Sequence, residues 1–202
     1  MIFVMLGGPA TGKGTVSKLI SKKNNIPHIS TGSLLRDGEI NKQVRDEISS
    51  GKLASDELVA SLLNTRILED DCVNGFVLDG FPRNRKQVDI LNNMLSKLNL
   101  KVDKVLELVV DDKLACKRIL ERKQCEKCGK VYGIDFKSKD DITCDVCGGS
   151  LVIRSDDTEE TLKTRIKIYK ENSKEIIEYY KLQGILITID SSSSPEKVLE
   201  MI

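Results

Sequence analysis

A glycine-rich segment at residues 7–15, Gly-Gly-Pro-Ala-Thr-Gly-Lys-Gly-Thr, constrains this chain more than any other feature of its sequence. It follows an apolar run at residues 2–6 and precedes a stretch in which Val16, Leu19 and Ile20 recur at helical spacing. Strand, glycine turn and helix in this order predict a phosphate cradle, because the backbone N–H groups of the turn and the positive end of the helix dipole converge on an anion. A glycine turn without a ligand is the alternative.

Lys13 adds a full positive charge to this cradle. The Ser or Thr that usually follows the lysine directly is displaced one place by Gly14, so Thr15 is the candidate hydroxyl near a metal ion. We therefore expect a polyphosphate to lie on an eight-residue run, which consists of Gly8, Pro9, Ala10, Thr11, Gly12, Lys13, Gly14 and Thr15.

The charge balance argues against a global electrostatic role. The 202 residues include 32 basic and 31 acidic side chains, a net charge of +1, so no overall field attracts nucleic acid or a membrane surface. No apolar segment approaches the ~20 residues that span a bilayer, and the beginning of the chain shows no signal-peptide pattern. We therefore expect a cytoplasmic location. Because disulfides are rare there, the six cysteines are expected to be metal ligands or buried thiols.

Apolar runs that alternate with helical patterns predict an α/β fold. Strands are expected at residues 2–6, within 26–32 where the strand runs into a turn, and at 73–78, 105–110 and 184–190. Two helical stretches that suggest a small insertion are expected at 40–49 and 55–68.

Asp79 follows one of these strands and begins the run Asp-Gly-Phe-Pro-Arg. An acid at the carboxyl end of a parallel strand lies where open α/β sheets bind ligands, so Asp79 suits a magnesium ion, held directly or through water. A turn aspartate before glycine is the alternative. His28, the only histidine, has no cysteine or acid at ligand spacing, and we expect it to have no chemical role.

Four of the six cysteines form two Cys-x-x-Cys pairs, each followed by glycine: Cys125, Cys128, Cys144 and Cys147. Such pairs bring four thiolates to one tetrahedral zinc ion, and because protein fills every position, the zinc would be structural. The alternatives are four unrelated cysteines, or a redox pair that leaves the second pair unexplained. Cys72 and Cys116 are expected to be buried small hydrophobes.

Arginine is scarcer than lysine, and six of the nine arginines lie beside these features: Arg36, Arg83, Arg118, Arg122, Arg154 and Arg165. The guanidinium fork matches phosphate oxygens, so this set suggests two phosphorylated ligands held end to end. We expect Arg83 and Gln87 to share a helix face. The alternatives are a solvated surface for Arg118 and Arg122, and a capping box for Asp157 with Glu160.

Together these motifs resemble the adenylate kinases, a branch of the P-loop nucleoside monophosphate kinases. The resemblance runs nearly end to end, through the cradle, Ser30-Thr31-Gly32 with Arg36, Gly51-Lys52-Leu53, Asp79-Gly80-Phe81-Pro82-Arg83, Arg118-x-x-x-Arg122, Arg154-x-Asp-Asp and Arg165. It implies a P-loop NTPase-type five-stranded parallel sheet flanked by helices, with a helical acceptor-binding insertion and a zinc-ribbon lid insertion. The implied domains are a core at 1–29, 59–121 and 158–202, an NMP-binding insertion at 30–58 and a zinc-binding lid at 122–157.

The resemblance also implies roles for particular residues. ATP would lie on the cradle with Arg118 and Arg122, its base mainly on Arg118 and the loop at 191–194, and Asp79 would hold Mg²⁺ through water. AMP would contact Thr31, Arg36, Lys52, Leu53, Ala54, Gly80, Arg83 and Gln87. Phosphoryl transfer would depend on Lys13, Arg83, Arg118, Arg122, Arg154, Arg165, Asp156 and Asp157. The chain departs from the family pattern at Ala10-Thr11 in place of Gly-Ala, at Ser33 in place of aspartate and at Glu121 in place of glycine, and its acceptor insertion between Arg36 and Gly51 is shorter than in many relatives.

Adenylate kinase activity is thus expected, with ATP and AMP as substrates, no nucleic-acid or membrane partner, and a monomer or small homo-oligomer. One alternative is a UMP/CMP or broad-donor kinase, which would accept other nucleotides. Another is a nucleic-acid-binding NTPase with a zinc ribbon, against which stand the near-zero charge and only eight aromatic residues. A non-catalytic scaffold, which would turn over no nucleotide, is the third.

Overall fold

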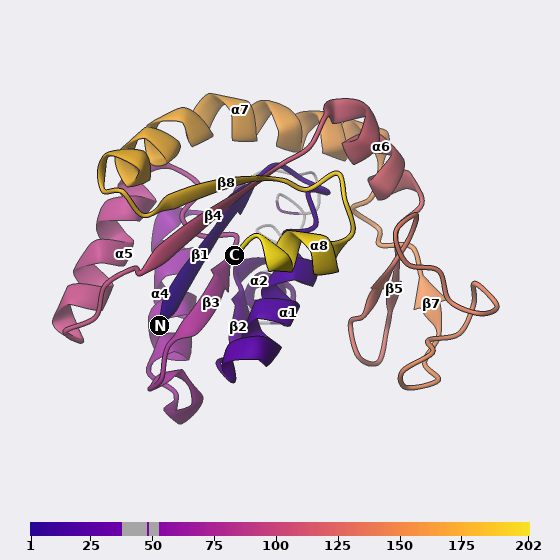
Figure 1. Ribbon diagram of the computed structural model, residues 1–202, viewed down its shortest axis with the longest axis horizontal. Coiled ribbons are helices and arrows are strands. Elements are labelled where there is room, and N and C mark those ends of the chain that lie inside the picture. Colours follow the sequence, from indigo (N-terminus) through magenta and orange to yellow (C-terminus); the bar gives the residue numbers. More distant parts are fainter. Residues whose placement is uncertain (38–47, 49–52) are drawn as a thin grey trace.

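The computed structural model describes residues 1–37, 48 and 53–202. A parallel sheet of five strands in the order β2-β3-β1-β4-β8 forms its centre (Figure 1). These strands are β1 (Ile2–Gly7), β2 (His28–Ser30), β3 (Phe76–Asp79), β4 (Lys104–Val109) and β8 (Leu186–Asp190). The predicted α/β fold with a five-stranded parallel sheet is therefore confirmed.

Helices cover both faces of this sheet and produce three layers (Figure 1). They are α1 (Lys13–Asn24), α2 (Thr31–Asp37), α4 (Asp56–Ile67), the 3-10 helix η1 (Asp70–Cys72), α5 (Arg85–Lys97), α6 (Asp112–Leu120), α7 (Glu159–Leu182) and α8 (Pro195–Glu200). Helices α1 and α8 pack on one face, and α4, α5 and α7 pack on the other. Among the residues that the structure describes, no helix is long and apolar enough to cross a membrane.

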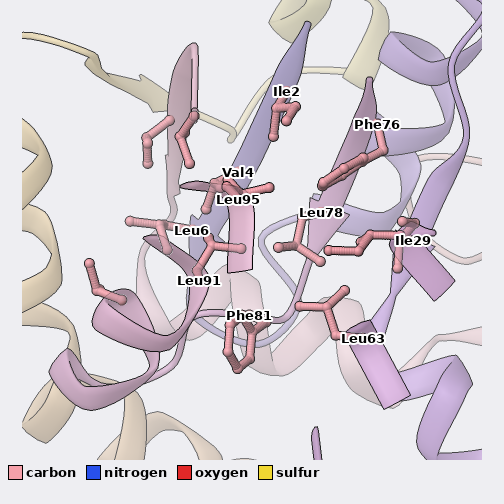
Figure 2. Packing of buried hydrophobic residues seen from close by; sticks show 14 of the residues in the cluster. Ile2, Val4, Leu6, Ile29, Leu63, Phe76, Leu78, Phe81, Leu91 and Leu95 are labelled. Atoms are coloured by element: carbon pink, nitrogen blue, oxygen red, sulfur yellow. The ribbon is translucent and has the colours of Figure 1, made fainter. Parts of the chain in front are cut away.

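The alternation of side chains along β1 explains why the sheet is buried on both faces. Ile2, Val4 and Leu6 point into the cluster shared with α4 and α5, where Figure 2 shows Val4 beside Leu95 and Leu6 beside Leu91. The residues between them, including Phe3 and Met5, belong to the cluster under α1 and α8. Successive strand residues face opposite sides, so a strand covered on both faces needs a continuous apolar run.

A second, smaller sheet lies to one side of the main sheet, at the right of Figure 1. Its antiparallel strands are β5 (Lys123–Cys125), β6 (Val131–Tyr132) and β7 (Leu151–Val152), in the order β6-β5-β7. Its buried cluster consists of Cys125, Tyr132, Cys144 and Leu151. This unit contains all four paired cysteines of the sequence.

The local structure differs from the expectation at two points. The strand expected at 73–78 begins only at Phe76, because Val73 follows η1 with 76% of its surface exposed and Gly75 takes a φ of 112°. The turn expected after β2 is a helix, since α2 starts at Thr31. The helix expected at 40–49 lies outside the described residues except for Ile48.

Candidate active site

A cavity of about 1100 Å³ opens at the carboxyl ends of the parallel strands. It is lined by the cradle, α2, the loop between β3 and α5, the small sheet, α7 and the loop between β8 and α8. All six arginines singled out from the sequence line it, and so do Thr31, Leu53, Ala54, Asp79, Gly80, Gln87 and Asp156. Lys52 lies outside the described residues. Side chains distant in sequence thus meet around one space large enough for two nucleotides.

The cradle connects β1 directly to α1. Gly12 caps α1 with a φ of 85°, and a Cβ atom at Gly7 would lie 2.5 Å from the carbonyl oxygen of Leu108. Glycine is therefore required where the loop turns and where it passes over β4. The Nζ atom of Lys13 donates hydrogen bonds to the carbonyl oxygens of Gly7 and Gly8, at 2.8 and 2.6 Å.

Lys13 lies in an enclosed and strongly positive environment. Burial lowers its pKa to about 8, and the positive charges of Arg83, Arg122 and Arg165 act in the same direction, while Asp79 opposes them. A cation that is costly to keep charged gains more from a bound anion than an exposed cation would.

His28 corrects one expectation, because it has an acidic partner after all. Its Nε2 atom lies 3.6 Å from Oδ2 of Asp79, and both side chains are 13% exposed. Adjacent strands β2 and β3 bring the two residues together. Burial would raise the pKa of Asp79, but the interaction with His28 and the charge of Lys13 outweigh it, so the pKa is lowered. Asp79 is therefore an ionised oxygen donor at the cradle, which fits magnesium.

The Asp-Gly-Phe-Pro-Arg segment is folded tightly beside Thr31. Gly80 takes a φ of 90°, and a Cβ atom there would lie 2.5 Å from Oγ1 of Thr31 and 3.1 Å from Nη2 of Arg83. Only glycine leaves room for both side chains. The Nε atom of Arg83 donates to the carbonyl oxygen of Gly80 at 2.7 Å, which fixes the guanidinium group of that side chain.

The expectation that Arg83 and Gln87 share a helix face is wrong. Helix α5 begins at Arg85 with Asn84 as its cap, so Arg83 precedes it. The side chain of Gln87 turns back instead: its Oε1 atom accepts the backbone N–H of Arg83 at 2.6 Å, and its Nε2 atom donates to Asp56 at 2.8 Å. No pattern in the sequence around Gln87 indicated this contact with Asp56, because Asp56 lies thirty-one residues away on another helix.

Three of the arginines are held by two neighbouring acids. Arg154 and Arg165 both contact Oδ2 of Asp156, at 2.7 and 2.5 Å, and Arg122 forms a two-bond ion pair with Asp157. Burial would raise the pKa of Asp156, but the two guanidinium groups hold it well below its usual range. These carboxylates position the arginines at the cavity.

Asp157 is not a capping residue, contrary to the capping-box alternative. The cap of α7 is Thr158, whose hydroxyl oxygen accepts the backbone N–H of Thr161 at 3.2 Å. Asp157 lies beneath Arg122, and its side chain is fully buried. The surface alternative for Arg118 and Arg122 is also wrong, because both line the cavity although Arg122 lies beyond the end of α6.

Arg118 is held at the other end of the cavity by contacts that the sequence did not indicate. Its Nη1 atom donates to the carbonyl oxygen of Ser191 at 2.9 Å, and its Nε atom lies 2.8 Å from Oδ2 of Asp135. Asp135 belongs to the segment between β6 and β7, seventeen residues along the chain. No short motif links these positions, so only the fold reveals the pair.

The four paired cysteines form one cluster, in which all ligand atoms lie within 4.8 Å of one another. The Sγ atoms of Cys125 and Cys147 are 3.5 Å apart, and those of Cys128 and Cys144 are 3.6 Å apart. Tetrahedral Zn–S bonds of ~2.3 Å place sulfur atoms ~3.8 Å apart, so the spacing fits zinc. Tyr132 donates a hydrogen bond to the Sγ atom of Cys144, which lowers the pKa of this thiol and favours its thiolate form.

Fold and site together place the chain among the P-loop proteins that bind nucleotides. The family model for adenylate kinase matches residues 5–185. The chain is similar to proteins named adenylate kinase from Fervidobacterium nodosum (41% identity, covering 100% of this chain and 95% of the relative) and Archaeoglobus fulgidus (41%, 98% and 94%). A third, from Clostridium tetani, is 40% identical with 100% and 96% coverage. The chain belongs to the adenylate kinase family.

Proposed function

We propose that this chain transfers the terminal phosphoryl group of ATP to AMP in a reversible, magnesium-dependent reaction that gives two molecules of ADP. The observation that carries the proposal is that one cavity joins the phosphate cradle to a second group of phosphate-binding side chains around Arg36 and Arg83. Family membership supports the same reaction. A donor on the cradle and an acceptor beside Arg83 would share the arginines between them.

The chemistry of the step fits these side chains. The acceptor is already a phosphate oxygen, so transfer requires alignment and charge stabilisation rather than a strong base. Lys13 would hold the donor phosphates, while Arg122, Arg154 and Arg165 stabilise the charge on the group in transfer. Magnesium, when bound beside Asp79 and Thr15, supplies further neutralisation of that charge.

We further propose three units with separate tasks. The core at 1–29, 59–121 and 158–202 would carry the cradle, and the lid at 122–157 would cover the donor. The insertion at 30–58 would bind AMP through Thr31, Arg36, Lys52, Leu53 and Ala54, and the core would complete the AMP site with Gly80, Arg83 and Gln87. A lid that closes only over bound nucleotide keeps water from the reactive phosphate. The four cysteines would hold a structural zinc ion that folds this lid.

A coupled assay of ADP formation tests the reaction. Purified protein with magnesium is supplied with ATP plus AMP, with ATP alone, and with ATP plus UMP or CMP. Rapid ADP formation only with ATP plus AMP is the expected result, since water is excluded until both sites are filled. Equal rates with ATP alone would show a hydrolase, and faster rates with UMP or CMP would show a kinase of another acceptor class.

A further inference from the structure

The guanidinium group of Arg118 is held from two sides by groups of different origin. On one side, Nη1 donates to the Ser191 carbonyl oxygen at 2.9 Å, and on the other, Nε lies 2.8 Å from the Asp135 carboxylate. The Arg118 side chain is only 9% exposed, whereas that of Asp135 is 32% exposed. Three segments therefore meet at this point: α6, the loop after β8, and the lid segment between β6 and β7.

The contacts of Arg118 with Ser191 and Asp135 form a clamp on its guanidinium group, and the two sides of this clamp differ in rigidity. Ser191 is 3% exposed, and both its backbone N–H and its hydroxyl bond the carbonyl oxygen of Val109, at 2.8 and 3.0 Å. The Ser191 carbonyl is thus fixed to the main sheet. Asp135 is carried by the small sheet, which touches the core nearby through a hydrogen bond from Lys18 to the Gly129 carbonyl oxygen at 3.0 Å. The clamp on Arg118 is complete only while the small sheet lies over the core.

Contacts at the edges of a guanidinium group leave its planar faces for stacking. The same end of the cavity is lined by Phe136, Pro195 and Val198, an apolar set that suits a nucleobase better than a phosphate. A planar cation among apolar walls provides a platform for an aromatic ring. The Lys13 end of the cavity, by contrast, is built for phosphate.

We infer that Asp135 is a positioning residue for the donor nucleotide: carried by the lid, its carboxylate completes the clamp that orients Arg118 against the donor base. The inference rests on the proposed function, which places ATP on the cradle. It predicts that Asp135 acts on the base and not on the phosphates.

The test compares Asp135→Asn with Asp141→Asn, a matched lid variant. Asp141 pairs with Lys123, but its side chain is 71% exposed and does not line the cavity. Its backbone φ of 59° also suits asparagine. Asp135→Asn is expected to raise the KM for ATP about fivefold, because a charge-assisted bond is replaced by a weaker neutral one. The KM for AMP and kcat are expected to stay within about twofold, and Asp141→Asn to match the parent enzyme.

Inorganic tripolyphosphate, as a competitive inhibitor against ATP, separates base from phosphate. Its inhibition constant is expected to be the same in the parent enzyme and in Asp135→Asn, since it lacks a base. An equal loss of affinity for tripolyphosphate and ATP would show that Asp135 acts through the phosphates or through lid folding, and would overturn the inference.

Asp135→Glu, which keeps the charge, is expected to recover most of the lost ATP affinity. An unchanged KM for ATP in Asp135→Asn, or a glutamate variant that behaves like the asparagine variant, would also overturn the inference. A parent enzyme that forms no ADP would instead refute the proposed function, so the two failures are distinguishable.

Discussion

The main sheet and the small cysteine-bearing sheet are stabilised in different ways. The main sheet buries two large apolar clusters, one on each face, with strands such as β1 and β4 almost completely enclosed. The small sheet has strands of only two or three residues. Its buried cluster has four members, Cys125, Tyr132, Cys144 and Leu151, and two of these are cysteines. Large apolar residues such as Ile142 and Val146 are exposed there.

This difference indicates that the two sheets have separable stabilities. Apolar burial of about 25 cal/mol per Å² can fold the core without help, whereas a unit with so little apolar surface would depend on the metal–thiolate bonds of the proposed zinc site. The proposed lid at 122–157 would benefit from such independence, because it could change position without disturbing the sheet beneath it.

Removal of the metal from the proposed zinc site is expected to produce the largest difference in stability between the two sheets. Cys125→Ser, or a strong chelator, is expected to lower the melting temperature of the small sheet while the core keeps its stability, because structural zinc sites contribute on the order of 10 kcal/mol. Calorimetry with circular dichroism should show an early lid transition followed by a core transition. Activity measured at temperatures below the lid transition should fall only slightly, because the small sheet is still folded there. An unchanged unfolding profile and no bound metal would contradict a structural zinc site.

The converse variant sharpens the comparison. Leu91 is fully buried between α5 and the sheet, so Leu91→Ala is expected to lower the free energy of core unfolding by about 3 kcal/mol. Metal content, measured by atomic absorption, should remain that of the parent. Loss of metal in this variant would show that core and lid fold as one unit.

Lys13→Ala tests whether the core supplies the chemistry. The substitution is expected to lower turnover about 10²-fold, near 3 kcal/mol, because it removes a cation directed at transferring phosphate. Steady-state ADP formation measures the loss, and Lys22→Ala, an exposed lysine on the same helix, is the matched control. Turnover close to that of the control would remove Lys13 from the site.

The lowered pKa of Lys13, about 8, predicts an alkaline limit to donor capture. As pH rises above 8, the free enzyme loses this charge, so kcat/KM for ATP should fall by up to about tenfold per pH unit, or 1.4 kcal/mol. At saturating ATP the bound phosphates raise the pKa of Lys13, so kcat should hold to higher pH. In Lys13→Arg, which stays protonated, the alkaline limb should vanish. Identical limbs in the two proteins would assign the effect to another group.

Ala10→Gly tests strain in the cradle and has the smallest expected effect. Ala10 takes a φ of 59°, which costs an L-residue ~1–2 kcal/mol and which glycine adopts without this cost. The greater conformational entropy of glycine in the unfolded chain offsets ~0.5–1 kcal/mol of this stabilisation. A net stabilisation of about 0.5 kcal/mol in urea unfolding is expected. Ala60→Gly, within regular helix α4, should destabilise by ~1 kcal/mol. A loss of stability in both variants would show that Ala10 is unstrained.

Features set by short segments could be predicted from the sequence. The cradle, the five strands and the cysteine pairs each depend on residues close together, and the family resemblance supplied the overall layout. Contacts between distant segments could not be predicted in this way. His28 meets Asp79 only because β2 and β3 are neighbours, and Asp135 meets Arg118 only because the segment between β6 and β7 lies beside α6. The local sequence around Asp157 is compatible with a capping box, but in the fold this side chain is buried against Arg122 instead.

Four of the six arginines around the cavity have carboxylate partners within the protein. Arg118, Arg122, Arg154 and Arg165 contact Asp135, Asp157 or Asp156. Each of these guanidinium groups therefore has a counter-ion within the protein while it also faces the cavity. Because each carboxylate offsets part of the guanidinium charge, a small monovalent anion gains little here, whereas a polyphosphate contacts several guanidinium groups at once, which favours highly charged ligands.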